Sequence, residues 1–580
     1  MTLSGRADYH SRPMNNETTP GTVQREAHGM QWRVVHDFAD ILTQIDILRL
    51  RNPETVRDWD VVKDNMHRTV VRAPDPADDD VPGLYLKRFK LDKFTRRLKH
   101  LVRPTQAAKE WEVSRALEER GIPTCRVLAV AERKPGLLYQ EAFLISRELP
   151  DTIPVRDYLE ERRWEDVDPR ERRRLIDEMA SLTARMVRSG IGHDDLHVGN
   201  IMIEPDGEPG ERLHILDLHR VSVGRVSRRG VTRMLVYLAD STGKRGVGSA
   251  EMVRFLRCFL RHWKGDDAVS PGLVRRWAER VQKAWDKHHR RHMRSRTKRC
   301  VVESTDFTYD RAGGYRMWRR REFPAKTALK VVDWHRMAVE GRPSRCELRK
   351  DGPRTQITRC GETGAGPVFV KAFLRESLWE RVKDIFRWRG RARDAWIAHR
   401  GCRVRGVPAV PGLCLMESGN TFRGEPDYLI TREVDAEADM QVLARAQSPD
   451  HERHQKLRLS ADERRDLSDA VADLFRLLAR TRTRHRDMKP SNILAGRRGD
   501  GWRLWLVDMD RTRFEVDWNR RLWVYHLAQC NAGLASGITL LDRLRCLRRI
   551  GKGRWSDTER LSIARDVLEL SLTRDPEWLR

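Results

Sequence analysis

The sequence predicts an α+β protein built as a tandem duplication of one domain. Two observations support this prediction. The pattern H-x-D-x-x-x-x-N occurs at residues 193–200 and again at 485–492, and the same predicted strands and helices surround both occurrences in the same order. A chain of 580 residues also exceeds what one hydrophobic core usually organises, which favours two or more domains.

The first matched landmark in each repeat is a β-rich run that carries a lysine. The two runs are GLYLKRF (83–89) and PVFVKAF (367–373). A predicted helix follows in both repeats, and in both a Trp lies ten residues before the Gly of a G-[IV]-P turn, in EWEVSRALEERGIP (110–123) and AWIAHRGCRVRGVP (395–408). The sequence therefore predicts a strand and then a helix at matched positions.

The next landmarks are a helix before each HxD loop and a strand after it. Apolar residues spaced by 4, 3 and 4 predict one face of the helix: Leu175, Met179, Leu182 and Met186, and Leu467, Val471, Leu474 and Leu478. The strand after each loop ends at an Asp, which is Asp217 or Asp508. Five landmarks that recur in one order make a chance match negligible.

The polar stretch 283–300 predicts the boundary between the repeats. We expect residues 1–30 to form a disordered polar tail, because they offer few apolar residues for a core. The first repeat is then placed at 31–288 and the second at 289–580.

Composition indicates an anionic partner. The formal net charge is +28, which favours nucleic acid, a phosphorylated lipid or glycan, or a membrane surface; a genome that uses Arg freely is the alternative explanation. Nine Cys without a C-x-x-C pair argue against a zinc site or a disulfide scaffold and favour a reducing compartment. The N-terminus has no signal-peptide pattern and no apolar run is long enough to span a bilayer, so we expect a cytoplasmic protein that at most lies on a membrane.

The order of the polar landmarks is that of a phosphoryl-transfer site. A strand lysine (Lys87, Lys371) can hold the α- and β-phosphates of ATP, and Glu110 on the following helix can fix that lysine by an ion pair. Asp195 and Asp487 are the candidate bases for an attacking hydroxyl. His193 and His485 are expected to brace their loops. The oxygen ligands that Mg²⁺ prefers would come from Asn200 with Asp217, and from Asn492 with Asp508. No G-x-x-x-x-G-K-[ST] pattern occurs, which excludes a P-loop.

The segments LYLKRF, AAKEW…GIP and above all ILDLHR resemble the lipopolysaccharide kinase (Kdo/WaaP) family, which has a protein-kinase-like fold. The resemblance covers most of both repeats. It implies a bilobal domain with a small β-rich N-terminal lobe and a helical C-terminal lobe. It also implies ATP-dependent phosphorylation of a sugar hydroxyl, heptose or Kdo, of lipopolysaccharide at the cytoplasmic face of the inner membrane.

Several features depart from that family. HDDLHVGNI is closer to the loop of small-molecule phosphotransferases, whereas HRDMKPSNI resembles a protein kinase. Ala395 stands where the first repeat has Glu110, with Asp394 one place off, so we expect the second repeat to be impaired or regulatory. A protein Ser/Thr kinase, a small-molecule phosphotransferase and a pseudokinase scaffold remain open as alternatives.

A basic stretch with apolar and aromatic residues follows each strand lysine, at 87–103 and at 378–391. Such a segment can rest at a bilayer interface or grip an anionic glycolipid, and the alternative is a solvated helix whose Trp residues pack inward. Nucleic acid is not favoured, because no recognised nucleic-acid-binding motif accompanies the charge.

Overall fold

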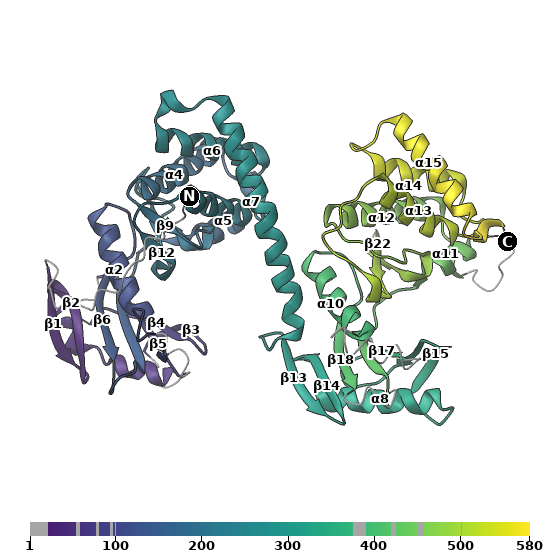
Figure 1. Cartoon of the computed structure of the whole chain (residues 1–580), viewed down its shortest axis with the longest axis horizontal. Helices are drawn as coiled ribbons and strands as arrows, with labels where there is room; N and C mark the ends of the chain where they lie inside the picture. The colour runs from purple at the N-terminus through teal and green to yellow at the C-terminus, as the bar shows by residue number, and fades with distance from the viewer. Residues whose placement is uncertain are drawn as a thin grey trace, which may run out of the picture. The chain divides into compact units, whose positions relative to one another are not determined.

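Figure 1 shows the computed structural model of the chain. It describes residues 21–53, 58–76, 81–92, 97–98, 100–374, 390–418, 425–448, 456–499 and 501–579. The chain divides into two compact units, Met1–His289 and Arg290–Arg580. The division falls inside helix α7 (Pro271–Lys298), within the polar stretch that marks the boundary in the sequence.

A seven-stranded antiparallel sheet forms the N-terminal lobe of the first unit (Figure 1). Its strand order is β1-β2-β6-β7-β5-β4-β3. The strands are β1 (Thr22–Ala27), β2 (Met30–Val35), β3 (Asp60–Asp64), β4 (Arg68–Ala73), β5 (Leu84–Lys90), β6 (Val127–Arg133) and β7 (Glu141–Arg147). The central strands β6 and β7 carry apolar runs because both of their faces are covered.

The predicted disordered tail, residues 1–30, overlaps the first strand of the sheet. Strand β1 pairs with β2 from Thr22 to Ala27. Its sequence TVQREA is polar because β1 is the edge strand of the sheet and three of its side chains are exposed. A polar edge strand therefore has the composition expected of a disordered tail. Residues 1–20 lie outside the described part of the chain.

The second unit repeats this sheet strand for strand. Its order is β13-β14-β18-β19-β17-β16-β15, again antiparallel throughout. The strands are β13 (Phe307–Ala312), β14 (Tyr315–Arg320), β15 (Cys346–Gly352), β16 (Thr355–Cys360), β17 (Val368–Phe373), β18 (Gly412–Ser418) and β19 (Asp427–Arg432). A helix without a counterpart in the first unit, α8 (Ala325–Val339), covers this sheet next to β15 and β16. The predicted α+β duplication is confirmed.

The C-terminal lobes are helical, as expected. The first holds α3 (Val155–Glu161), α4 (Pro169–Arg188), α5 (Arg228–Gly243), α6 (Ser249–Lys264) and α7, with the short strands β8 (Ile153–Pro154), β9 (Ile191–His193), β10 (Ile201–Ile203), β11 (Leu213–Ile215) and β12 (Val221–Val223). The second holds α11 (Met440–Ala446), α12 (Ala461–Arg480), α13 (Arg520–Ala532), α14 (Leu540–Gly551) and α15 (Asp557–Leu572), with β20 (Ala438–Asp439), β21 (Ile493–Arg498) and β22 (Gly501–Leu506).

One helix in each unit joins the sheet to the helical lobe. These helices are α2 (Gln106–Glu119) and α10 (Arg391–Val404). Each buries a Trp at the matched position, Trp111 and Trp396, both 2% exposed. Trp396 donates from Nε1 to the Cys300 carbonyl at 2.9 Å and packs edge-on against Phe307. The two Trp residues therefore anchor matched helices, of which α2 carries Glu110.

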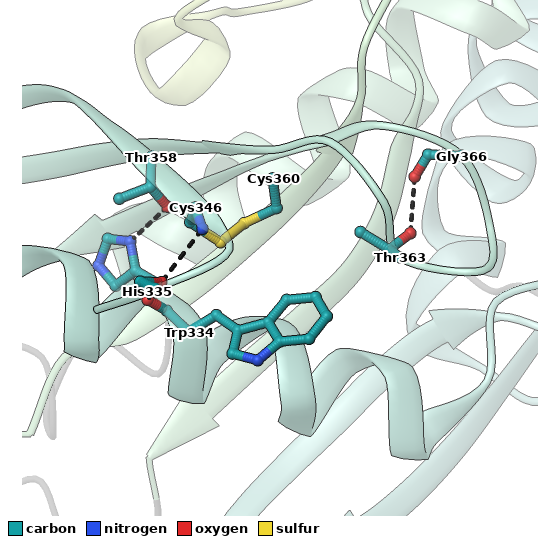
Figure 2. Close-up of a disulfide and its surroundings, with 8 residues drawn as sticks. Trp334, His335, Cys346, Thr358, Cys360, Thr363 and Gly366 are labelled. Atoms are coloured by element: carbon teal, nitrogen blue, oxygen red, sulfur yellow. Dashed lines mark hydrogen bonds between the residues drawn. A yellow bond between two sulfur atoms is a disulfide. The ribbon is translucent and has the colours of Figure 1, made fainter. Parts of the chain in front are cut away.

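A disulfide joins Cys346 of β15 to Cys360 of β16 (Figure 2). The two residues are direct cross-strand partners. The absence of a C-x-x-C pair predicts no disulfide scaffold, and this disulfide corrects that expectation. Register between two strands brings them together, and spacing along the chain does not reveal it.

Three buried histidines distinguish the second unit. His335 of α8, His399 of α10 and His526 of α13 are 1%, 6% and 0% exposed. Burial lowers the pKa of each to about 4, from an ordinary value of 6.5. His399 Nδ1 donates to the Val410 carbonyl at 2.7 Å, and His335 Nδ1 lies 2.9 Å from Thr358 Oγ1 (Figure 2). These side chains are neutral core residues at pH 7.

No helix within the described residues is long and apolar enough to cross a membrane.

We predict that Trp396→Ala lowers the free energy of unfolding of the second unit by about 3–5 kcal/mol, because it leaves a cavity and an unpaired carbonyl at Cys300. Calorimetry of the full chain should show one shifted transition. Leu541→Ala is the control, because Leu541 is 74% exposed and its loss should change stability by less than about 0.5 kcal/mol. An unshifted transition in Trp396→Ala would contradict the packing described above.

We predict that acid destabilises the second unit between about pH 6.5 and pH 4. Above this window the three histidines are neutral in both states. As pH falls through it, the unfolded chain takes up protons that the folded core refuses, so stability is lost at up to about 3 kcal/mol per histidine. His399→Asn keeps a donor for the Val410 carbonyl and cannot titrate, so it should flatten the pH dependence of the transition that Trp396→Ala shifts. An equally steep dependence in His399→Asn would contradict the buried, neutral state of His399.

Candidate active site

The centre of the first site is an ion pair between a strand and a helix. Lys87 on β5 lies with Nζ 3.1 Å from Oε2 of Glu110 on α2. Glu110 is 2% exposed at its side chain and Lys87 19%. Burial alone would lower the pKa of Lys87, but the Glu110 carboxylate outweighs burial and holds that pKa above its usual value. The structure thus pairs the lysine and the glutamate that the sequence singled out.

Asp217 lies next to this pair and is linked to it by a histidine. His219 Nδ1 is 2.7 Å from Asp217 Oδ1 and 3.7 Å from Glu110 Oε1. The backbone of Asp217 is left-handed, with φ of 61°, and this sharp turn directs the end of the strand into the site. Burial raises the pKa of Asp217, but His219 and Arg68 outweigh it, so the carboxyl is held ionised.

The HxD loop is tied to the same strand end by its histidine. His193, 1% exposed, donates from Nε2 to the Leu216 carbonyl at 3.1 Å and accepts at Nδ1 from the Asp195 amide at 3.1 Å. Burial lowers the pKa of His193, which keeps it neutral for this double role. The bracing role expected for His193 is therefore what the hydrogen bonds show.

Asn200 closes the loop by donating from Nδ2 to the Asp195 carbonyl at 2.9 Å. This bond orients the amide group, so its oxygen is the atom left to act as a ligand. Asp195, Asn200 and Asp217 are consequently held on one framework of backbone hydrogen bonds. Among the described residues no group of three His, Cys, Asp or Glu side chains could hold a metal ion by itself.

The second HxD loop has the same framework. His485 donates from Nε2 to the Val507 carbonyl at 2.9 Å, and Asn492 donates from Nδ2 to the Asp487 carbonyl at 2.8 Å. The contacts around His485 and Asp487 differ from those of the first loop. His485 Nδ1 is buried without a hydrogen-bond partner, and Asn492 Nδ2 also donates to Asp487 Oδ2 at 3.2 Å. Lys489 Nζ lies 3.2 Å from Asp487 Oδ2, so the candidate base of this repeat has a cation beside it.

The strand lysine of the second repeat has a different partner. Lys371 on β17 pairs directly with Asp508, because Ala395 occupies the place of Glu110 and offers no carboxylate. Asp508 keeps the left-handed backbone, with φ of 56°. Burial raises its pKa, but Lys371 outweighs burial and the carboxyl is held ionised. The candidate metal ligand and the candidate phosphate-binding lysine of this repeat are bound to each other.

The residue two places after each Asp was missed by sequence reasoning. It is His219 in the first repeat and Asp510 in the second, where Asp510 pairs with Arg391 of α10 at 3.1 Å. The signal available was the contrast between ILDLHR and LVDMDR in two otherwise matched strands. The charge at this position and the charge at the helix position of Glu110 both differ between the two repeats.

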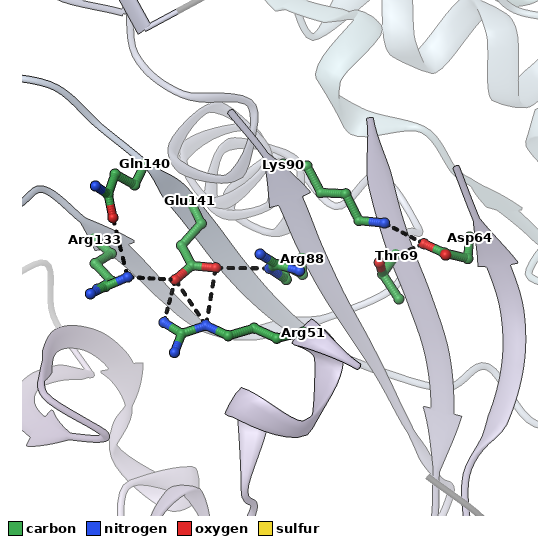
Figure 3. Close-up of polar contacts among 8 residues, drawn as sticks. All are labelled: Arg51, Asp64, Thr69, Arg88, Lys90, Arg133, Gln140 and Glu141. Carbon is green, nitrogen blue, oxygen red and sulfur yellow. Dashed lines mark hydrogen bonds and ion pairs between the residues drawn. The ribbon is translucent and has the colours of Figure 1, made fainter. Parts of the chain in front are cut away.

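In the first basic segment, 87–103, Arg88 and Lys90 form internal ion pairs (Figure 3). Arg88 pairs with Glu141 at 2.8 Å and Lys90 with Asp64 at 2.6 Å. Arg51 and Arg133 also bind Glu141. Residues 93–96 and 99 lie outside the described part of the chain, as does 378–389 of the second segment.

A cavity of about 580 Å³ in the first unit lies among α4, α5, α6 and α7 and is lined mainly by apolar side chains such as Met179 and Leu235. None of Lys87, Glu110, Asp195, Asn200 or Asp217 lines it. It is therefore separate from the candidate phosphoryl-transfer site.

The chain is similar to several known proteins. The chain is 26% identical over 189 residues to the lipopolysaccharide core heptose(I) kinase WaaP of Pseudomonas aeruginosa, a match that covers 32% of this chain and 70% of that protein. It is 25% identical over 158 residues to the protein of the same name from Escherichia coli strain K12, covering 27% of this chain and 60% of that protein. A solved structure titled "WaaP in complex with acyl carrier protein" is similar at 23% identity and a TM-score of 0.32, over 43% of this chain and 98% of that one.

The model of the lipopolysaccharide kinase (Kdo/WaaP) family matches residues 55–259 and 358–532. One matched segment lies in each repeat, and together they make up more than half of the chain. The family resemblance that the motifs indicated is confirmed, and with it the kinase class. The chain belongs to the lipopolysaccharide kinase (Kdo/WaaP) family.

Proposed function

We propose that the first repeat transfers the γ-phosphoryl group of ATP to a hydroxyl of a lipopolysaccharide sugar or of another envelope glycolipid. The observation that carries the proposal is the buried Lys87–Glu110 pair beside an ionised Asp217 and the braced HxD loop. The names of the relatives supply the acceptor class, since both are called heptose kinases.

The residues of the first repeat fit ATP and Mg²⁺. Lys87 would hold the α- and β-phosphates, and Asn200 with Asp217 would hold Mg²⁺ together with phosphate oxygens, the ligand set this ion prefers. Bound Mg²⁺ would neutralise charge on the transferred group. Asp195 would accept the proton of the acceptor hydroxyl, and its position is fixed by His193 and Asn200.

The second repeat is proposed to be impaired or regulatory. Lys371 would have to leave Asp508 to bind nucleotide phosphates, and Asp508 would have to leave Lys371 to bind a metal ion. Ala395 offers no carboxylate that could pair with Lys371 instead. Asp487 and Asn492 would otherwise take the roles of Asp195 and Asn200.

We propose that the chain acts on the cytoplasmic side of the membrane, in peripheral contact with it. In the first basic segment, Leu101 and Val102 are 52% and 74% exposed, an arrangement that fits a bilayer interface or the lipid part of the acceptor.

The first test is transfer of label from γ-labelled ATP with Mg²⁺ to an extract of envelope glycolipid. Asp195→Ala should lower transfer by about a hundredfold or more, the scale of a lost base, and Asp487→Ala should leave most of it intact. Label on protein alone would support the protein-kinase alternative, and label on a small soluble molecule the phosphotransferase alternative. No transfer to any acceptor would support the scaffold alternative.

Glu110→Gln should lower kcat/KM by about tenfold to a hundredfold, because the buried ammonium of Lys87 loses its charged partner. Glu112→Gln is the matched control on the same helix. Glu112 is 63% exposed and pairs with Arg33, so its change should lower kcat/KM by less than about twofold. Equal effects of the two changes would argue against a role for the pair in phosphate binding.

A further inference from the structure

A second cavity, of about 500 Å³, lies in the second unit away from its HxD loop. Its walls come from α10, β13, β14, β22 and the chain segment 406–412 that follows α10. None of Lys371, Asp487, Asn492 or Asp508 lines it. Its volume is in the usual range of small-molecule sites.

Four arginines define the cavity chemically. Arg320 of β14 and Arg400 of α10 are largely buried, with side chains 14% and 12% exposed. Arg403 of α10 and Arg503 of β22 are exposed lining residues. Phe307 and Trp505 add apolar rings to the lining. Five donors on each guanidinium, in a planar fork, suit phosphate oxygens better than any other common anion-binding side chain.

The acids available to these arginines are few and peripheral. Glu322, 57% exposed, lies 3.6 Å from Arg320, and Asp306, 60% exposed, lies 3.3 Å from Arg400. Among the described residues no carboxylate lines the cavity. Arg400 Nε is buried without a hydrogen-bond partner. Burial lowers the pKa of Arg320, and the neighbouring Arg403 lowers it further, so both its burial and its neighbours disfavour the charged guanidinium.

At the matched positions of the first repeat, glutamates accompany or replace the arginines. Counting from the matched Trp residues, Glu118 stands where the second repeat has Arg403. Counting back from the strand-end Asp residues, Arg212 corresponds to Arg503, and Arg212 is buried between Glu171 at 2.7 Å and Glu178 at 2.8 Å. Ala470 replaces Glu178 in the second repeat. In the second repeat a cation, Arg403, thus stands in place of one acid, Glu118, and Ala470 stands in place of another, Glu178.

We propose that this cavity binds a phosphorylated small molecule, with Arg320, Arg400, Arg403 and Arg503 as its anion ligands and Phe307 and Trp505 against its carbon skeleton. The site is additional to the proposed phosphoryl-transfer site and does not depend on turnover by either repeat. Its walls include α10, which carries Ala395, and β22, which leads directly to Asp508.

The test is isothermal titration of the full chain with pyrophosphate, glucose 6-phosphate and, as an uncharged reference, glucose. The background variant is Lys87→Ala/Lys371→Ala and Mg²⁺ is omitted, so that the phosphate-binding lysines of both kinase clefts are removed. We expect saturable binding of a phosphorylated probe and none of glucose. Arg403→Glu, which installs the acid found in the first repeat, should weaken binding by about tenfold or more.

Arg548→Glu is the matched control. Arg548 is an exposed residue in the last turn of α14 and does not line the cavity, so the same change of charge there should alter affinity by less than about twofold. Arg503→Gln is a second test substitution, which removes a positive charge without adding a negative one, and it should also weaken binding. The proposal is overturned if no phosphorylated probe binds saturably, or if Arg403→Glu and Arg548→Glu have equal effects.

Discussion

Both repeats depend on the neutralisation of a lysine ammonium that a central strand carries into the lobe. A buried charge without a partner costs several kcal/mol, whereas a hydrogen-bonded pair is tolerated. The first repeat meets this constraint with Glu110, which is itself almost completely buried. The helix α2, its Trp111 and the strand β5 are the parts that bring the two charges together, so the geometry of the site follows from the packing of one helix on one sheet.

The second repeat meets the same constraint in a different way, and several neighbours have changed with it. Lys371 takes Asp508 as its partner after the loss of the helix Glu. In the first repeat Lys109 donates to the His219 carbonyl at 2.7 Å; in the second the matched Asp394 lies 3.6 Å from Arg513. His219 itself is replaced by Asp510, which binds Arg391. The charges between this helix and the strand end have been rearranged together, which is the behaviour of a coupled network.

Sequence patterns were sufficient for the duplication, the strand lysines and the pairing of Lys87 with Glu110, because spacing within one helix and recurrence in two repeats carry that information. They were not sufficient for the disulfide between Cys346 and Cys360, which depends on cross-strand register. Composition did not distinguish strand β1 from a polar tail, because an edge strand needs few apolar residues. The pairing of Lys371 with Asp508 could not be predicted from sequence patterns either, because it depends on which acidic side chain lies within reach of the Lys371 ammonium.

The structure shows which arginines of this positively charged chain are neutralised by acids within the fold. Arg51, Arg88 and Arg133 surround Glu141, and Arg212 lies between two glutamates; such arginines are already neutralised by the fold. Arginine enrichment by genome composition alone would add residues mainly at exposed positions, where a charge costs little. Arg320 and Arg400 are instead largely buried in one cavity, which the exposed Arg403 also lines, and the carboxylates nearest to them, Glu322 and Asp306, are themselves exposed. Exposed carboxylates compensate the desolvation of a buried cation only in part. Part of the excess charge therefore lies at one cavity of the second repeat, where the proposed anionic ligand would relieve a desolvation cost that the neighbouring acids offset only in part.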